Sequence, residues 1–433
     1  MRIAYLIPGC GVSGGIAVIC QHANRLLRRG HDVMLISESA EREIGWFPGQ
    51  RVPIRGMAET PPALAVLVAP SWSTTFRVAV LPARHKFYFV QSDETRFHPA
   101  GSPWEHVTRL SYTFDWNYLT EARWIRRWLD EGFGQDAELV PNGLDAEIFH
   151  PTEPLQPRGA RPRILLEGAI GLPYKGMAEA FAAVQPLDVE VWCVSSYGKP
   201  QPGWRCDRFF EQIPMTEMKR VYSSCDVLLK LSRVEGFFGP PMEMMACGGT
   251  CVVGEVTGYD EYIEPEVNAL VVDPLRPEQA TVALRRIIED DALRARLLAA
   301  GRDTAARWQW EPSIDVLERR FLDAVEGRRA APTGPLRDAT ARSIAYFYGQ
   351  LRGEELVTAP APPKPVPPAS GEAAAGAAPV PDPAPAAPVA TFEVDPVERV
   401  IARLRAQPAF RRACRIAWNG WQSWRAMRGG GPR

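Results

Sequence analysis

Two glutamates stand eight positions apart in a stretch that is rich in glycine and proline. Glu235 lies on a loop, and Glu243 is expected in the first turn of a helix that begins near Pro240 or Pro241. The free backbone N–H groups at a helix start favour anions such as a diphosphate. A carboxylate in that turn can accept hydrogen bonds from the two hydroxyls of a ribose, and one on the loop can reach a group being transferred. The spacing therefore indicates a site for a phosphate-bearing ligand.

The residues alone leave other interpretations open. Glu243 could simply complement the helix dipole, and Glu235 could be a solvated loop charge. The glycine-rich turn at 9–15 follows an apolar run and lets the backbone approach a ligand closely, although its spacing differs from G-x-G-x-x-G. With Glu38 near the place of a ribose-binding acid, this turn leaves a dinucleotide oxidoreductase open. The glutamate pair alone leaves a glycoside hydrolase open.

Alternating strands and helices must position these residues. The expected elements are a strand at 2–7, a helix at 16–29 and a strand at 32–37, and then a strand at 163–167, a helix at 177–184 and a strand at 189–195. The two groups are joined by a proline-rich stretch at 151–162. The fold class is therefore α/β, with two Rossmann-like domains that face each other across a cleft. Such a cleft can hold one substrate on each wall.

Several stretches, taken in order, resemble the family 4 glycosyltransferases, which have the two-domain GT-B fold and retain anomeric configuration. Residues 235–243 look like the E-x7-E motif of that family. The other similar stretches are V-P-N-G-L-D at 140–145, the loop at 168–176, the segment at 257–272 and the helix at 310–321. The resemblance spans about residues 1–326. A narrower similarity, F-Y-F-V-Q at 87–91 with residues 94–102, is to bacterial rhamnosyltransferases of surface-glycan assembly.

The resemblance implies a role for each motif residue. Lys175 would bind the donor diphosphate and, with Glu235, would be catalytic. Glu235 would lie beside the transferred sugar, and Glu243 would hold the ribose. The other donor-binding residues would be Gly15, Gly236, Phe237, Phe238 and Gly239. The sequence contains no D-x-D, so we expect a lysine and a helix dipole in place of a metal clamp, and no metal site.

Two departures from the family pattern concern the donor site. Gly168 is followed by Ala169 instead of the usual arginine near this position, so Lys175 is expected to be the only cation there. In the acidic motif, two phenylalanines precede Gly239, whereas the family usually has glycine directly after one aromatic residue. The backbone amides that would bind sugar hydroxyls are therefore expected to be shifted.

Candidate acceptor-binding residues come from the tryptophan-rich first half. Trp72 and Gln91 stand near expected strand ends, and His98 lies beside the 91–102 motif. Trp124 and Trp128 are four apart on a helical stripe, so we expect them in the core. The residues expected on the solvated face of that helix are Arg123, Arg126 and Arg127.

Composition limits the function further. The 433 residues are 46% hydrophobic and 23% charged, with a net charge of −1, which removes the electrostatic argument for a nucleic-acid binder. The eight cysteines contain no C-x-x-C pair, so neither a zinc ribbon nor a disulfide framework is indicated. No apolar run approaches the roughly 18 residues of a membrane span, and the N-terminal run is too short for a signal peptide. We expect a cytoplasmic protein with no cofactor beyond a nucleoside-diphosphate sugar as co-substrate.

The chain divides into five expected regions. They are an acceptor domain at 1–150, a donor domain at 151–311, a crossover helix returning to the first domain at 312–357, a disordered Pro/Ala linker at 358–392 and a basic amphipathic helical tail at 393–433. The tail holds nine arginines and suits the inner face of an anionic membrane, or else a docking surface on a protein.

These features together predict a retaining glycosyltransferase. It would move a sugar from a nucleoside-diphosphate sugar to a glycan or lipid-linked acceptor in bacterial surface polysaccharide assembly, with rhamnose suggested by the narrower similarity. A non-catalytic sugar-nucleotide-binding scaffold of a glycan assembly complex is the alternative.

Overall fold

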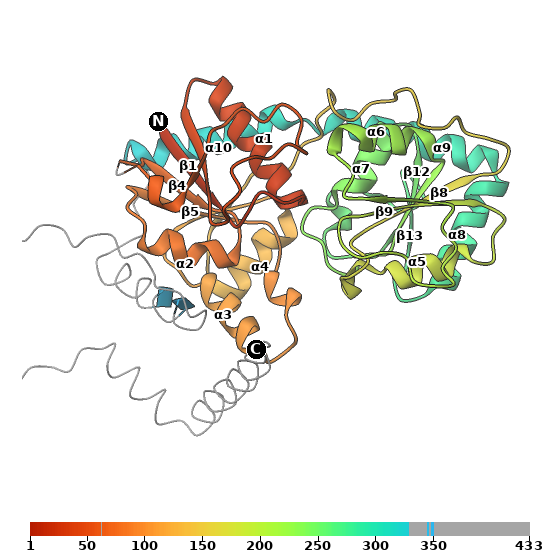
Figure 1. Ribbon diagram of the computed structural model, residues 1–433, viewed down its shortest axis with the longest axis horizontal. Coiled ribbons are helices and arrows are strands. Elements are labelled where there is room, and N and C mark those ends of the chain that lie inside the picture. Colours follow the sequence, from red (N-terminus) through yellow and green to blue (C-terminus); the bar gives the residue numbers. More distant parts are fainter. Residues whose placement is uncertain (62, 329–343, 346–347, 350–433) are drawn as a thin grey trace, which may run out of the picture. The chain divides into compact units, whose positions relative to one another are not determined.

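The computed structural model describes residues 1–61, 63–328, 344–345 and 348–349. Two separate parallel sheets are formed in this part of the chain (Figure 1). The first has the strand order β3-β2-β1-β4-β5-β6-β7, and the second has the order β10-β9-β8-β11-β12-β13. The strand order reverses between β1 and β4 and again between β8 and β11, which opens a crevice at the carboxyl ends of the strands in each sheet. The expected α/β class with two Rossmann-like domains is confirmed.

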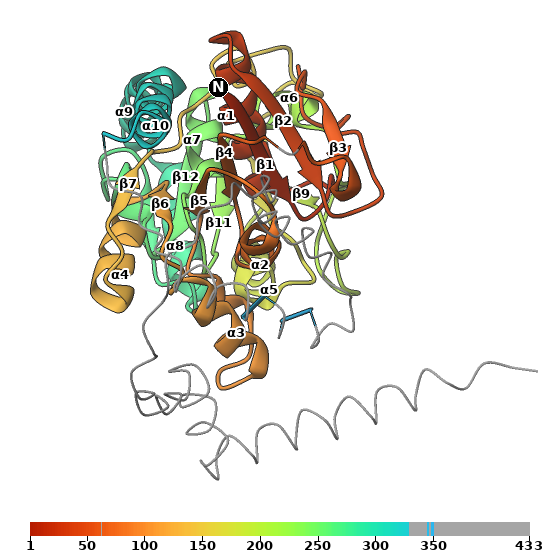
Figure 2. The same ribbon diagram turned by 90° about the vertical axis from the view of Figure 1, so that its left-hand side faces the viewer.

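The first domain is built on the seven-stranded sheet, whose strands β1, β2 and β3 can be followed side by side in Figure 2. Its strands are β1 (Arg2–Ile7), β2 (Asp32–Ser37), β3 (Ile54–Gly56), β4 (Val66–Ala69), β5 (His85–Val90), β6 (Asn117–Thr120) and β7 (Ala137–Leu139). Its helices are α1 (Gly14–Arg28), α2 (Trp72–Val80), α3 (Pro103–Ser111) and α4 (Arg123–Phe133), with short 3₁₀ turns η1 (Met57–Glu59) and η2 (Glu94–Phe97).

The second domain is built on the six-stranded sheet. Its strands are β8 (Arg163–Glu167), β9 (Glu190–Ser195), β10 (Arg208–Glu211), β11 (Val227–Lys230), β12 (Thr250–Gly254) and β13 (Leu270–Val272). Its helices are α5 (Met177–Val184), α6 (Met215–Ser224), α7 (Gly239–Ala246), α8 (Pro277–Glu289) and α9 (Asp291–Arg307), with η3 (Pro173–Lys175) and η4 (Tyr259–Glu261). The strands expected at 2–7, 32–37 and 163–167 and the helix expected at 177–184 have these bounds.

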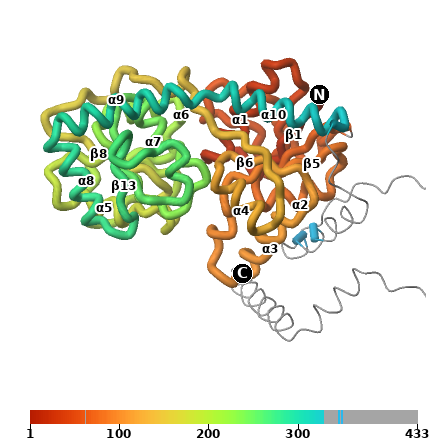
Figure 3. Tube along the Cα trace, turned by 180° about the vertical axis from the view of Figure 1, so that it is seen from behind, coloured from red at the N-terminus to blue at the C-terminus, as the bar shows by residue number. Residues whose placement is uncertain are grey.

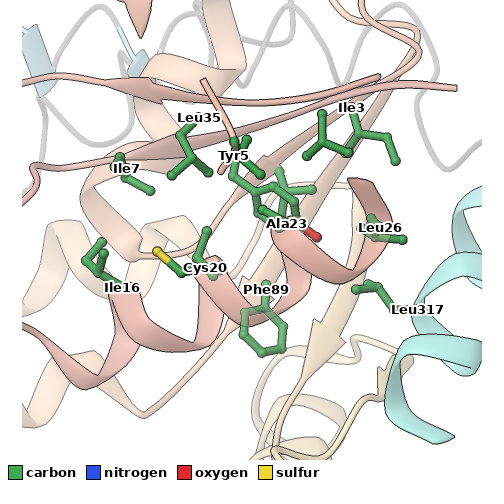
Figure 4. Packing of buried hydrophobic residues seen from close by; sticks show 14 of the residues in the cluster. Ile3, Tyr5, Ile7, Ile16, Cys20, Ala23, Leu26, Leu35, Phe89 and Leu317 are labelled. Carbon is green, nitrogen blue, oxygen red and sulfur yellow. The ribbon is translucent and has the colours of Figure 1, made fainter. Parts of the chain in front are cut away.

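Burial on both faces explains why the strands read as continuous apolar runs. In β1, Ile3, Tyr5 and Ile7 pack against helix α1, and the alternate residues Ala4 and Leu6 join the core on the opposite face. The close-up in Figure 4 shows the first of these cores, in which α1 contributes Ile16, Cys20, Ala23 and Leu26. Both faces of the sheet are therefore covered, and its carboxyl edge is left for a ligand.

Helix α10 (Trp310–Val325) follows α9 and packs on the first domain (Figure 3). Its buried residues Ile314, Leu317 and Phe321 belong to the same core as α1. Arg29 at the end of α1 adds ion pairs at 2.7 Å to Glu318 and 2.8 Å to Asp315. The chain thus crosses from the second domain back to the first.

The P-N-G-L-D stretch lies where the chain passes between the domains. The amide of Leu144 donates to the Trp308 carbonyl at 2.9 Å. A Cβ added to Gly143 would lie 2.4 Å from the Trp310 backbone nitrogen, so a side chain at this position would collide with the start of α10. The glycine of this motif is required by close backbone packing.

The expected Pro/Ala linker at 358–392 and the basic tail at 393–433 lie outside the described residues, as does most of 329–357. After α10 the described chain includes Tyr348, whose ring stacks on Phe76 of α2 at 4.2 Å between centroids. Among the helices of the described residues, none is both long and apolar enough to span a bilayer.

Candidate functional site

A cavity of about 940 Å³ lies at the carboxyl ends of the strands of both sheets. The first domain contributes the glycine-rich turn after β1 and residues that follow β4, β5 and β6. The second contributes residues that follow β8, β9 and β11 and the start of α7. Parallel sheets bind ligands at this edge, and the cavity is large enough for a drug-sized molecule or larger.

Lys175 and Glu235 meet in the wall that the second domain supplies. The Lys175 Nζ lies 2.9 Å from both carboxylate oxygens of Glu235. Burial raises the pKa of Glu235, but the charges of Lys175 and Lys230 outweigh burial and hold that pKa below its ordinary value. The two residues expected to be catalytic therefore form one ionised pair.

Lys175 was expected to be the only cation at the donor site, but Lys230 lines the same cavity. Lys230 is the last residue of β11, and its side chain is 4% exposed. Its Nζ lies 3.9 Å from a Glu235 oxygen and donates to the Glu167 backbone carbonyl at 3.1 Å. The signal in the sequence was a lysine directly after three buried apolar strand residues. A buried ammonium group needs a partner of opposite charge or a hydrogen-bond acceptor at the strand end.

Glu243 does not lie in the first turn of its helix, as the sequence suggested. Helix α7 begins at Gly239, one residue before the first proline, so Glu243 is the fifth helical residue and lies in the second turn. The proline pair does occupy the helix start, as expected. The carboxylate still lines the cavity, one turn further from the N-terminal amides.

A buried tyrosine joins Glu243 to a second carboxylate. The Tyr222 hydroxyl lies 2.9 Å from Glu243 Oε2 and 2.8 Å from Glu167 Oε2. Burial, with a further contribution from the charge of Glu167, raises the pKa of Glu243 to about 8. Two carboxyl groups that share one phenol can accept hydrogen bonds from two neighbouring hydroxyls. Glu167 and Tyr222 were not identified as site residues from the sequence.

The remaining donor-site candidates separate into two sets. Gly15, Gly236, Phe237 and Gly239 line the cavity. Phe238 is fully buried in the core of the second domain and is not among the cavity-lining residues, and its carbonyl accepts from the Tyr262 hydroxyl. The second phenylalanine of the motif thus anchors the loop from behind.

The acceptor candidates are also divided. Gln91 lines the cavity and donates to the Pro70 carbonyl at 2.9 Å. Trp72 and His98 lie outside the cavity lining and pack on each other, with ring centroids 5.3 Å apart and perpendicular planes. A role for these two in acceptor binding stays a prediction.

Two buried carboxyl groups of the first domain received no role from the sequence, although Glu94 belongs to the 87–102 motif. Glu94 accepts hydrogen bonds from the Trp72 amide at 2.6 Å and the Tyr88 hydroxyl at 3.1 Å. Glu121 accepts from Asn142 Nδ2 at 2.8 Å and from the Phe237 amide at 2.9 Å. Burial raises the pKa of both carboxyl groups to about 8. Each follows a buried strand, which was the available signal.

Helix α4 packs as expected and also contacts the second domain. Trp124 is 8% exposed, and Trp128 packs against Tyr112 with ring centroids 4.9 Å apart, so the predicted core role of both is confirmed. Arg123, Arg126 and Arg127 are exposed as expected. Arg123, however, also pairs with Glu261 of the second domain at 3.0 Å.

Metal-binding and disulfide-forming groups can be assessed for the described part of the chain. Across residues 1–61 and 63–328 with the four described residues beyond, no three His, Cys, Asp or Glu side chains are grouped to hold a metal ion. The seven cysteines in the same ranges are free thiols, and Cys414 lies outside them.

Comparison with known proteins identifies the type of fold and one family segment. Residues 208–304, the segment that contains Lys230, Glu235 and Glu243, match the family model Glycosyl transferases group 1. In the structure of Anabaena HepE in complex with UDP-glucose, the fold is similar with a TM-score of 0.62 and 13% identity, over 76% of this chain and 100% of that one. The two-domain architecture is therefore the GT-B fold.

Two sequence relatives cover most of the described part of the chain. The O-antigen biosynthesis protein RfbC of Myxococcus xanthus is 25% identical over 328 residues, covering 73% of this chain. The chain spans 23% of the length of that relative. The D-inositol 3-phosphate glycosyltransferase of Acidothermus cellulolyticus is 24% identical over 416 residues, covering 76% of this chain and 89% of the relative.

Proposed function

We propose that this chain is a retaining glycosyltransferase that takes a sugar from a nucleoside-diphosphate sugar and transfers it to a hydroxyl of a glycan or lipid-linked acceptor. The observation that carries the proposal is the group of ionisable side chains at the carboxyl edge of the second sheet. It contains Lys175 and Lys230 beside Glu235, with Glu243 and Glu167 on Tyr222. Tyr222, Lys230, Glu235 and Glu243 of this group lie in the segment that matches group 1 glycosyl transferases, which supports the same conclusion.

Charge separation explains what the lysines would do. As the bond from the sugar to the diphosphate breaks, the leaving oxygen gains negative charge, and fixed positive groups near it lower the barrier. Lys175 and Lys230 both line the cavity, as do Gly239 and Pro240 at the start of α7, where the positive end of the helix dipole lies. Pro240 and Pro241 have no backbone N–H, and the Gly239 N–H donates to the Phe237 carbonyl at 3.0 Å, so the helix contributes its dipole and not free N–H groups. These groups would stabilise the leaving diphosphate without a metal ion.

The carboxyl groups would orient the donor. Glu243 and Glu167 share the Tyr222 hydroxyl, and the two hydroxyls of a ribose could bind to that pair. Glu235 lies on the loop between the lysines and the first domain, where the sugar ring would stand.

The proposed reaction forms one bond and breaks one. The acceptor oxygen bonds to the anomeric carbon as the carbon–oxygen bond to the diphosphate breaks. Retention follows if the acceptor approaches on the face from which the diphosphate leaves, and the acceptor proton then passes to the leaving diphosphate. In this scheme the lysines stabilise the diphosphate, and no side chain is required as a base.

The biological setting is proposed from the relatives. RfbC of Myxococcus xanthus is named as an O-antigen biosynthesis protein, and we propose bacterial surface polysaccharide assembly for this chain also. Rhamnose is the proposed sugar because of the F-Y-F-V-Q similarity at 87–91. We further propose a cytoplasmic protein whose tail at 393–433 contacts the inner face of the membrane.

A panel of nucleoside-diphosphate sugars tests the proposal. The purified chain is incubated with each donor and with lipid-linked or oligosaccharide acceptors, and the product anomer is assigned by NMR. Transfer with retained configuration supports the proposal. If the chain binds a donor but neither transfers the sugar of any donor nor hydrolyses it, the result would instead support a sugar-nucleotide-binding scaffold.

A further inference from the structure

The first domain holds one peptide group of the acidic loop at both ends. This peptide group joins Gly236 to Phe237, directly after Glu235. Its carbonyl accepts from Trp124 Nε1 at 2.9 Å, and its N–H donates to Glu121 Oε1 at 2.9 Å. Glu121 lies in the short turn after β6, and Trp124 is the second residue of α4. We call these two side chains the peptide clamp.

The glycines of the second domain fit the clamp closely. A Cβ on Gly236 would lie 1.7 Å from the Gln91 backbone oxygen, which is far inside contact distance. Gly258 has φ +83°, and a Cβ there would lie 2.3 Å from Trp124 Nε1. Both positions therefore accept only glycine when the domains are in this arrangement.

A third contact joins the start of α4 to η4 of the second domain. Helix α4 has Ala122 at its N-cap position, and this residue provides no side-chain cap. Glu261 of the second domain accepts instead from the backbone N–H groups of Arg123 at 2.7 Å and Trp124 at 3.2 Å. A carboxylate at a helix start satisfies unpaired donors and favours the helix dipole. The second domain thus caps a helix of the first.

We propose that Glu121 and Trp124 are positioning residues, which fix the loop of Glu235 against Lys175 only when the two domains are closed on each other. The inference rests on the proposed transferase function and adds to it the way in which domain closure completes the donor site. When the domains separate, the peptide group loses both partners, and the loop is then held only by contacts within the second domain, such as the pair of Glu235 with Lys175.

The contacts of Glu121 favour a positioning role over a direct one in the reaction. Its Oε1 accepts from Phe237 and its Oε2 accepts from Asn142, so each oxygen has a partner that holds it in place. The Trp124 indole nitrogen can only donate, and it is 2.9 Å from the Gly236 carbonyl. Both side chains act on the loop through its backbone.

Hydrogen exchange measures the clamp without any substrate. We expect the Phe237 amide to exchange about tenfold faster or more in Glu121→Leu, because one hydrogen bond is worth roughly that factor. Trp124→Phe removes the other end of the clamp and should speed exchange of the 235–239 peptide as well. Trp128→Phe is the matched control. Trp128 lies in the same helix as Trp124 but packs on Tyr112, so this variant should leave the exchange rate of the 235–239 peptide unchanged. Unchanged exchange in both clamp variants would overturn the proposal.

Kinetics separate the clamp from the reaction itself. In Glu121→Leu and Trp124→Phe, we expect turnover to fall about tenfold to a hundredfold, with UDP affinity within about twofold of wild type, because UDP would rest on the second domain alone. Glu121→Gln should recover most of the turnover, since its amide oxygen can accept from Phe237 and its amide nitrogen can donate to Asn142 Oδ1. A Glu121→Gln variant as inactive as Glu121→Leu would show a charge-dependent role and overturn the positioning assignment. If no donor is transferred by the wild type, the proposed function fails, while the exchange experiment still decides the clamp.

Discussion

The two walls of the cavity differ in the charge of their side chains. The second-domain wall carries cations and carboxylates in contact, with Lys175 at 2.9 Å and Lys230 at 3.9 Å from Glu235. Among the described residues that line the first-domain wall, none is a lysine, arginine or histidine. That wall consists mainly of the glycine turn at 9–15, polar side chains such as Gln91, and the buried carboxyl groups of Glu94 and Glu121. The charge of Asp145, which also lines it, is balanced by Arg25 at 3.3 Å, and we call this wall the neutral wall.

For the proposed transferase, this difference favours the second-domain wall for the donor and the first-domain wall for the acceptor. A diphosphate needs cations, and the described lining provides them on the second domain alone. An acceptor with neutral hydroxyls needs donors and acceptors at fixed positions, which backbone amides and uncharged side chains supply without a net field. Changes on the charged wall should therefore affect the chemical step most, and changes on the neutral wall should affect acceptor binding or stability.

The largest effect is expected from Lys175→Ala. Removing a fixed positive group that faces developing negative charge typically lowers turnover about 10²–10³-fold. The buried Glu235 would also lose its nearest counter-charge, so its pKa should rise toward the ordinary value or above it. Turnover is measured at saturating and at limiting donor.

Lys199→Ala is the matched control for this variant. Lys199 also belongs to the second domain, but its side chain is 69% exposed and pairs with Glu211 at 3.2 Å. We expect wild-type kinetics from it, because exposed pairs contribute little. If Lys175→Ala behaved like the control, the charged wall would not be the site of the chemistry.

Gly236→Ala tests whether the two walls must close together. The added methyl group would meet the Gln91 backbone oxygen, which cannot rotate away as a side chain would. We expect turnover to fall about 10²-fold, because a displacement of about 1 Å at a reacting centre has that effect.

The control for that variant lies in the neighbouring helix. A Cβ on Gly132 of α4 meets no atom within 4 Å, so Gly132→Ala should keep full activity. It should also stabilise the helix by up to about 1 kcal/mol, as measured by thermal melting. Full activity of Gly236→Ala would mean that the closed arrangement is not the reacting one.

The sequence predicted the charged wall better than the neutral one. Glu235, Glu243 and Lys175 stand in motifs with fixed spacing, so their meeting at one edge follows from the order of strands and helices. Lys230 was missed because nothing within the motifs marks it, and only its place at the end of a buried strand does. The helix start was misjudged by one residue because proline is tolerated at several positions of a first turn.

On the neutral wall, the sequence could not show which side chains meet. Trp72 and His98 follow strands whose carboxyl ends border the cavity, yet the two side chains pack on each other outside the cavity lining. Glu121 receives its partners from Asn142 and Phe237, the second of which is 116 positions away, and no local pattern encodes that pairing. Contacts between domains depend on tertiary packing, so they appear only in the folded structure.

Gln91→Ala should sharpen the assignment of the neutral wall to the acceptor. Gln91 lines the cavity, and the loss of one hydrogen bond to an acceptor should raise the KM for the acceptor about fivefold to tenfold. The KM for the donor should stay within about twofold. Gln185→Ala is the comparison, because this exposed glutamine lies outside the cavity lining and should leave both constants unchanged. A rise in the donor KM would contradict the assignment.

The smallest effect on activity is expected from Glu94→Gln, whose effect on stability depends on pH. Burial raises the pKa of Glu94 to about 8 from an ordinary 4.5, so between these values the folded state keeps a proton that the unfolded state has lost. Stability therefore falls as pH rises through this window, by roughly 1 kcal/mol per pH unit for one such group. Glutamine keeps the oxygen that accepts from Trp72 but does not titrate.

Urea unfolding of wild type and Glu94→Gln, followed by tryptophan fluorescence at pH 6 and pH 8, tests this difference. Between pH 6 and pH 8, the free energy of unfolding of the variant should rise by about 2 kcal/mol relative to that of the wild type. Only the wild type has a buried carboxyl group at this position whose proton is lost on unfolding in this range. Glu121 and Glu243 have the same raised pKa in both proteins, so their contributions cancel in the comparison. Glu289→Gln, at a side chain that is 69% exposed, should run parallel to wild type. Parallel curves for Glu94→Gln as well would mean that Glu94 is ionised in the folded protein, and the first-domain wall would then carry a charge of its own.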